Sequence, residues 1–227
     1  MFLRQSLVLL LAPFTAWAAA PALDGCEASA GALQETLWRA EQSLQAGEEQ
    51  AVRDHVGQVE REGSRSPYFL LRAGALLEGL KDQAGADAAY TKALQAAQSP
   101  EPGGDANVAR LYRAAALIHL RRSPEAAPLV ALVRAAPGAL GKYACRYIPV
   151  AMAMADSGDL SGATELLEAV RGAAPGARSI HDALVEFAFR SGDAPRIDDA
   201  LATALARFPQ DVAFTVRLAN LTKIRGH

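Results

Sequence analysis

Two consecutive segments decide how this chain folds: ACRYIPVAMAMADSGDLSGATELLEAVRGAAPGA at residues 144–177 and RSIHDALVEFAFRSGDAPRIDDALATALARFPQD at residues 178–211. Placing one over the other aligns identical residues 34 positions apart, among them Gly158 and Gly192, Asp159 and Asp193, Leu167 and Leu201, and Pro175 and Pro209. Gly226 follows Gly192 by a further 34 residues. A fixed period of this length predicts a repeat architecture, in which each unit is one piece of supersecondary structure.

The recurring residues predict two helices in each unit. Gly158 lets the chain leave a first helix through a left-handed turn, and Asp159 can cap a second helix by accepting backbone N–H bonds. Pro175 ends the second helix, because proline cannot donate a hydrogen bond and disfavours helical geometry in the residue before it. Small residues where the two helices cross allow close packing. One such pair cannot bury its apolar face alone, so the units must stack.

This pattern resembles the tetratricopeptide repeat. The matching residues of the first unit are Tyr147, Ala151, Gly158, Asp159, Ala163, Leu167 and Pro175, and those of the second are Gly192, Asp193, Leu201, Ala204 and Pro209. The first unit departs from the repeat pattern at Met154, Val170 and Pro149, and the second at Ile197. The resemblance implies an all-α fold, a right-handed superhelical α-solenoid of helix-turn-helix pairs.

The same pattern extends more weakly over most of the chain. We expect five helix pairs in a unit spanning 28–227, at residues 28–62, 67–100, 108–141, 144–177 and 178–211. In the second pair, Gly74 takes the small position of the first helix. A capping helix at 212–225 is expected to cover the last apolar face and to present polar groups outward. The residues expected to do so are Arg217, Asn220, Lys223 and Arg225.

The third pair is irregular. Asp105 or Asn107 is expected to cap its first helix, and Ser123 followed by Pro124 is expected to open its second. Pro128 is expected to interrupt that second helix, since a proline in a helix interior removes a hydrogen bond and clashes with the preceding turn.

Residues 1–18 resemble a secretory signal peptide. Arg4 precedes an apolar run, which Pro13 breaks and small residues follow. Cleavage is expected after Ala18, or alternatively after Ala22, and residues 19–27 are then a flexible segment before the repeats. A retained transmembrane helix is the competing interpretation, but the run turns to alanine before it reaches the roughly 20 residues that a bilayer needs. The form of the signal and the alanine- and arginine-rich composition favour a bacterial, periplasmic protein.

The two cysteines, Cys26 and Cys145, admit three interpretations. They can pair in an oxidising compartment, although residues so far apart in an extended repeat array meet only if the N-terminal segment folds back. Leu23-Asp24-Gly25-Cys26 also resembles a lipobox, in which Cys26 carries lipid. In the third interpretation both are ordinary thiols, with Cys145 a small buried hydrophobe.

The composition argues against several classes of function. The chain carries 23 Lys and Arg against 25 Asp and Glu, a formal net charge of −2, with no basic cluster, so nucleic-acid binding is not expected. The four histidines are isolated, and no zinc-binding spacing, nucleophile motif or phosphate-binding loop occurs in the sequence. We therefore expect no enzymatic activity, no metal and no cofactor.

The resemblance implies a concave groove lined by the first helix of each pair. The positions that line it correspond here to Tyr68, Leu71, Glu78, Tyr112, His119, Ile148, Met152, Asp182, Glu186, Phe189, Asn220 and Lys223. Such a groove is apolar in the middle and acidic toward Asp182 and Glu186, so it suits a peptide with apolar anchors and a basic residue. The alternative is that several of these side chains only pack against neighbouring helices.

The main functional hypothesis is a non-enzymatic scaffold that binds a protein or peptide partner and assists assembly or stability of an envelope complex. A first alternative is an outer-membrane lipoprotein, similar to the repeat-containing factors that assemble type IV pilus secretins, with lipid on Cys26. A second, from another class, is a thiol-dependent redox protein that uses Cys145. A homo-oligomer that stacks through the terminal repeat faces is also compatible with the sequence.

Overall fold

The computed structural model describes residues 31–98, 106–135 and 144–225. Within these ranges the secondary structure is helical and no strand occurs, which confirms the all-α prediction. The helices are α1 (Gly31–Ala46), α2 (Glu49–Glu62), α3 (Pro67–Gly79), α4 (Gln83–Gln98), α5 (Ala106–His119), α6 (Ser123–Arg134), the 3₁₀ turn η2 (Ala144–Tyr147), α8 (Ile148–Asp156), α9 (Leu160–Ala173), α10 (Arg178–Ser191), α11 (Ala194–Arg207) and α12 (Val212–Arg225). The predicted signal peptide and the segment 19–27 lie outside the described residues.

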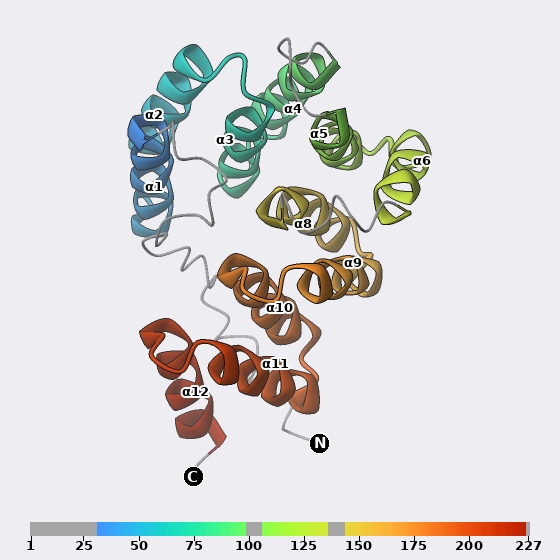
Figure 1. The fold of residues 1–227 in the computed structure, drawn as a ribbon. Coiled ribbons are helices and arrows are strands. Elements are labelled where there is room, and N and C mark those ends of the chain that lie inside the picture. Colours follow the sequence, from blue (N-terminus) through green and yellow to red (C-terminus); the bar gives the residue numbers. More distant parts are fainter. Residues whose placement is uncertain (1–30, 99–105, 136–143, 226–227) are drawn as a thin grey trace, which may run out of the picture.

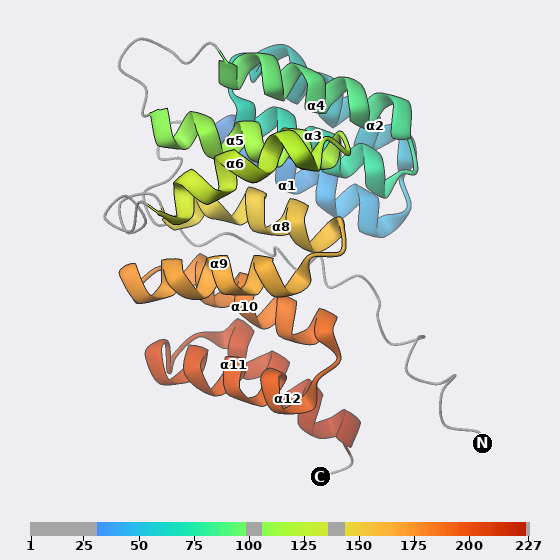
Figure 2. The ribbon, with the colours of Figure 1, turned by 90° about the vertical axis from the view of Figure 1, so that its right-hand side faces the viewer.

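Successive helix pairs follow one another along an arc. Figure 1 shows the arc running from α1 through α5 to α12, with α4, α6, α9 and α11 on its outer side. The first helices of the pairs, α3, α5, α8, α10 and α12, lie toward its inner side, and we call them the inner row. In the perpendicular view of Figure 2, the helices form layers from α4 at one end to α12 at the other.

The turns in the last two full pairs have the predicted geometry. Gly158 and Gly192 have φ angles of 98° and 67°, in the left-handed region that glycine adopts readily. The side chain of Asp159 accepts a hydrogen bond from the backbone N–H of Gly162 at 2.9 Å, and Asp193 caps α11 in the same way. Both predictions, the left-handed turn and the aspartate cap, are confirmed.

Non-glycine residues make the same turn in the second and third pairs. Lys81 and Arg121 have φ angles of 60° and 61°. The Arg121 N–H bonds the carbonyl of Ile118, three residues back, as the Gly158 N–H bonds that of Ala155. Arg121 therefore stands where Gly158 stands in the fourth pair. The third pair thus begins one residue earlier than the predicted residue 108, which corrects the repeat register of Tyr112 and His119.

The predicted interruption at Pro128 needs correction, and of the two alternative caps of α5 only Asn107 lies among the described residues. Pro128 does not interrupt its helix, because α6 continues to Arg134. The missing backbone hydrogen bond would join Pro128 to the carbonyl of Pro124 in the first turn of α6. Both residues are exposed, so water can hydrogen-bond that carbonyl instead. Asn107 lies inside α5, where its side chain accepts from Arg110, and does not cap the helix. Pro149 lies at the start of α8, where proline is tolerated, after the short turn η2.

Small residues lie where paired helices cross, as predicted. Ala151 and Ala163 of the fourth pair are wholly buried. In the second pair, a Cβ atom added to Gly74 would lie 2.4 Å from Cε1 of Tyr90, so α3 and α4 approach too closely for any larger side chain. A large apolar core extends from Leu37 to Phe187, and a smaller one joins α10, α11 and α12 around Leu201 and Phe214.

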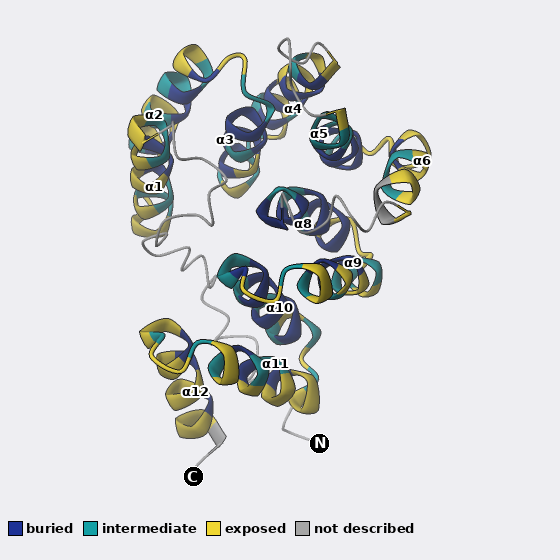
Figure 3. Cartoon of the chain, in the orientation of Figure 1, coloured by how far each residue is buried: buried dark blue, intermediate teal, exposed yellow. Residues whose placement is uncertain are grey.

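The last helix differs from the predicted polar cap. Arg217 is buried, and its Nη1 donates to Oδ1 of Asp182 on α10 at 2.7 Å, so this side chain does not face outward. Asn220 and Lys223 are exposed, and the side chain of Arg225 is outside the described set. Figure 3 shows most of α12 as exposed, in contrast to α8. Four large apolar side chains of α12 are also exposed: Val212, Val216, Leu218 and Ile224.

Candidate functional site

The twelve predicted groove residues differ widely in their accessibility. Four are buried in the core: Tyr68, Leu71, Tyr112 and Ile148. Six are partly exposed: Glu78, His119, Met152, Asp182, Glu186 and Phe189. Asn220 and Lys223 are exposed. Accessible surface on the inner row therefore increases toward the C-terminal end, and the buried members have little surface to offer a partner.

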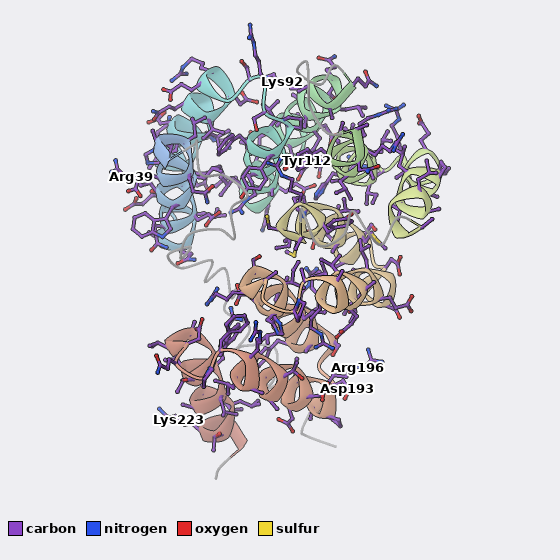
Figure 4. All side chains as sticks on the ribbon, viewed as in Figure 1. Arg39, Lys92, Tyr112, Asp193, Arg196 and Lys223 are labelled. Atoms are coloured by element: carbon purple, nitrogen blue, oxygen red, sulfur yellow. The ribbon has the colours of Figure 1, made fainter. Side chains whose placement is uncertain are left out.

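An aromatic and arginine cluster fills the inner row between α3 and η2. The rings of Tyr68 and Tyr112 lie 6.4 Å apart between centroids. Arg146 donates from Nη1 to the hydroxyl of Tyr112 at 3.0 Å, and its guanidinium lies 5.9 Å from that ring's centroid. In Figure 4 Tyr112 lies in the upper half of the arc, among α3, α5 and α8. These contacts hold consecutive pairs together, because they join side chains from three different pairs.

A second arginine, Arg72 on α3, is paired with Glu41 on α1. Both side chains are largely buried, and burial lowers the pKa of Arg72 to about 10. Sequence reasoning found neither Arg72 nor Arg146, because an arginine on a helix is usually solvent-exposed and its burial depends on the neighbouring pair.

Two predicted groove residues, Glu78 and His119, both contact Tyr90 of α4. Tyr90 donates from its hydroxyl to Oε2 of Glu78 at 2.8 Å, and the ring of His119 stacks on Tyr90 with centroids 4.2 Å apart. His119 Nδ1 lies 3.6 Å from the same carboxylate oxygen. Burial raises the pKa of Glu78, but hydrogen bonds from His119 and Tyr90 outweigh it and leave this pKa below its usual value.

On α10, the predicted acidic surface is largely neutralised. Asp182 is paired with Arg217, and Asp156 of α8 accepts from Arg190 at 2.6 Å. Glu186 lies between these two pairs on the helix and forms neither a hydrogen bond nor an ion pair with any described residue. Burial raises the pKa of Glu186, against the attraction of Arg217 and Arg190. Glu186 is thus the carboxylate on this surface that an incoming cation can pair with.

Equivalent positions of three consecutive repeats remain accessible around Glu186. Met152, Glu186 and Asn220 follow at intervals of 34 on α8, α10 and α12, and none is buried. Phe189 and Lys223 are likewise 34 apart on α10 and α12. Figure 4 shows Lys223 projecting from α12 at the end of the arc. We call Met152, Glu186, Phe189, Asn220 and Lys223 the inner-row site.

Cys145 lies in η2, is 8% exposed, and is disulfide-bonded. Cys26 lies outside the described residues, so its pairing with Cys145, or its lipidation, stays a prediction. Among residues 31–98, 106–135 and 144–225, no group of three His, Cys, Asp or Glu side chains is placed to hold a metal ion. In the same ranges, every helix is too short or too polar to cross a bilayer.

No protein-family model and no curated protein matches this sequence. The resemblance to the tetratricopeptide repeat therefore depends on the residues of the repeats themselves, above all on the 34-residue spacing of Gly158 and Gly192 and on the caps that follow them.

Proposed function

We propose that this chain is a non-enzymatic interaction scaffold of the bacterial cell envelope. In this proposal the helix pairs form a right-handed superhelical α-solenoid of tetratricopeptide type, and the inner-row site binds a peptide or protein partner. Binding there assists assembly or stability of an envelope complex.

The observation that carries the proposal is the partly buried carboxylate of Glu186, which forms no hydrogen bond or ion pair with any described residue. A carboxylate that is desolvated without a partner costs free energy, and a cation from a ligand recovers it. The neighbouring carboxylates Asp156 and Asp182 are already satisfied by arginines of this chain. A single lysine or arginine of a partner can therefore pair with Glu186, because the two neighbouring carboxylates already have arginine partners.

Met152 and Phe189 supply the apolar part of the same surface. A methionine side chain adapts to irregular apolar partners, and an aromatic ring offers a large contact area at low entropic cost. Asn220 adds a donor and an acceptor at the exposed end of the row. The complementary ligand is a helical or extended segment with apolar anchors next to one basic residue.

The test uses two fluorescein-labelled helical peptides that share a leucine stripe and differ only in carrying lysines or glutamates beside it. We expect the lysine peptide to bind at least about tenfold more tightly than its glutamate twin, as measured by fluorescence anisotropy. Glu186→Gln should weaken the lysine peptide about tenfold, since a charge-assisted hydrogen bond contributes about 1.5 kcal/mol. Glu125→Gln, which removes an exposed carboxylate on the outer helix α6, is the matched control. Equal binding of the two peptides, or no change in Glu186→Gln, contradicts the proposed site.

The envelope location is tested by the intact mass of the mature protein from its native source. A mass that begins at residue 19 or 23 supports the periplasmic scaffold. A mass that begins at Cys26 with added acyl chains favours the lipoprotein alternative instead. Rapid, reversible reaction of Cys145 with small thiols would favour the redox alternative, whereas a buried disulfide should react slowly.

A further inference from the structure

The disulfide of Cys145 limits where the chain before α1 can lie. Cys145 is buried in η2 and is disulfide-bonded. It is the only cysteine among the residues that the structure describes, so its partner lies outside them. The sequence contains two cysteines, and the other, Cys26, precedes the first residue of α1, Gly31, by only five positions.

A bond between Cys26 and Cys145 leaves little slack before α1. An extended chain spans about 3.5 Å per residue, so Cys26 lies at most about 18 Å from Gly31. The Cα atoms of two disulfide-bonded cysteines are about 5.5 Å apart. The start of α1 and Cys145 are therefore no more than about 23 Å apart when these two cysteines pair.

Only a path on the inside of the arc is this short. Along the arc, α3 and α5 lie between α1 and η2 (Figure 1). Tyr68 of α3 lies against Tyr112 of α5, which accepts a hydrogen bond from Arg146 of η2. Neighbouring helix axes are about 8–10 Å apart, so a direct crossing of α3 and α5 uses nearly the whole available length. A path around the outer helices α4 and α6, each about 10 Å across, is too long.

The inner surface along this path is apolar and buried. Leu71, Ile148 and Asp182 occupy the same position in the second, fourth and fifth pairs, counted back from the left-handed turn of each. Leu71 and Ile148 are both buried, whereas Asp182 is partly exposed. Three residues earlier, Tyr68 and Cys145 are likewise buried. The buried apolar part of the inner surface thus coincides with the path from α1 to Cys145, and the accessible polar part lies beyond it.

The residues before α1 suit this surface by size and charge. Residues 23–30, LDGCEASA, remain in the chain after either predicted cleavage. Apart from Leu23 they are small or acidic, so their backbone can approach the helices closely, and none is basic. Arg72 and Arg146 lie along the path, on α3 and η2. Acidic residues next to Cys26 therefore meet an inner surface that carries basic groups.

We propose that residues 23–30 cross α3 and α5 on the inner side of the arc, fixed by a disulfide between Cys26 and Cys145. The chain's own N-terminal segment is then the ligand of the apolar part of the groove, around Tyr68 and Tyr112. A partner is left with the inner-row site. This surface goes beyond the inner-row site and does not depend on binding there, and the pairing excludes lipid on Cys26.

The first experiment identifies the bond in the full chain, purified from its native envelope and digested with trypsin without reductant. Trypsin releases Cys145 in a peptide of residues 143–146 and Cys26 in a peptide that ends at Arg39. We expect mass spectrometry to find these two peptides joined, and to find them separated after reduction with a phosphine. A disulfide between two copies of the peptide 143–146 would place a second chain at Cys145 and overturn the proposal. Acyl chains on Cys26 would overturn it as well.

The second experiment measures what the segment covers, by hydroxyl-radical footprinting of side chains in the oxidised full chain. The double variant Leu23→Ser, Cys26→Ser removes the anchor and the largest side chain of the segment. We expect oxidation of Tyr68 and Tyr112 to rise at least about threefold in this variant, because their cover is released. Phe208, which follows α11 and is partly exposed, should be oxidised at an unchanged rate.

The matched control is Ala28→Ser, a small change in the same segment that keeps both cysteines. Its footprint should equal that of the wild-type chain. Unchanged oxidation of Tyr68 and Tyr112 in the double variant overturns the proposal, because the segment then does not cover them. An equal rise at Phe208 also overturns it, since it shows a general loosening of the helices instead of a local cover.

Discussion

Substituting Gly74 by alanine should destabilise the protein, although alanine is the better helix former. Gly74 lies in the interior of α3, where the exchange by itself favours folding by about 1 kcal/mol. The new Cβ, however, would lie 2.4 Å from Cε1 and 2.7 Å from Cδ1 of Tyr90. These are atoms of a rigid ring that is wholly buried, stacked on His119 and hydrogen-bonded to Glu78.

The size of the effect follows from what Tyr90 must give up. Overpacking a filled core costs about 1–3 kcal/mol, and moving the ring weakens a hydrogen bond to a charged acceptor that contributes about 1.5–3 kcal/mol. After subtraction of the helix-propensity gain, Gly74→Ala should lower the free energy of unfolding by about 2 kcal/mol. For a chain of this size that corresponds to a fall in Tm of roughly 4–8 °C.

The assay is urea unfolding followed by circular dichroism at 222 nm, with Gly57→Ala as the matched control. Gly57 is also in a helix interior, but a Cβ there meets only the flexible end of Arg61, 3.4 Å away, so this variant should be more stable by about 0.5–1 kcal/mol. Combining Gly74→Ala with Tyr90→Leu, which removes the ring, should show a coupling free energy of about 1 kcal/mol or more. If Gly74→Ala stabilises the protein as Gly57→Ala does, the reasoning from the close α3–α4 crossing is refuted.

Three further predictions concern the C-terminal half. Asp159→Ala removes the cap of α9 and should lower the free energy of unfolding by about 1 kcal/mol, measured by urea unfolding; an unchanged midpoint would contradict the capping role. Arg178 and Asp211 form a partly buried, bidentate pair, at 2.6 and 3.3 Å. Asp211→Asn should therefore lower the free energy of unfolding by about 1–3 kcal/mol. Glu125→Gln, which removes an exposed charge, should lower it by less than about 0.5 kcal/mol. Burial lowers the pKa of His181, so the folded state binds a proton less readily than the unfolded state. This contribution to stability is present above the unfolded pKa of about 6.5 and declines as the pH falls below it. His181→Phe should lose that decline in urea midpoints measured between pH 8 and 5.

The sequence by itself determined the features that depend on neighbouring residues along the chain. A left-handed turn at Gly158 or Gly192 and a cap at Asp159 or Asp193 require only the local backbone and one side chain, so residue type and spacing predict them directly. The all-helical class follows from the same pattern. Lys81 and Arg121 carry no such signal, because nothing local favours a lysine or arginine in the left-handed conformation. The predicted register of the third pair was therefore wrong by one residue.

Tertiary structure decided which side chains of the inner row are available. Arg217 was expected to face water, yet it pairs with Asp182 on the preceding first helix, 35 residues away. Arg146 bonds Tyr112 of the preceding pair, and Glu78 bonds Tyr90 across its own pair. These partners depend on how the helices of one pair, or of successive pairs, pack on one another, which the spacing of apolar residues does not specify. Glu186 is set apart from other helix-surface glutamates because its neighbours Asp156 and Asp182 pair with arginines, while Glu186 forms no ion pair with any described residue. The local chemistry of the repeats thus predicts the helices and their turns, and the packing between repeats decides which charges and which faces remain for a partner.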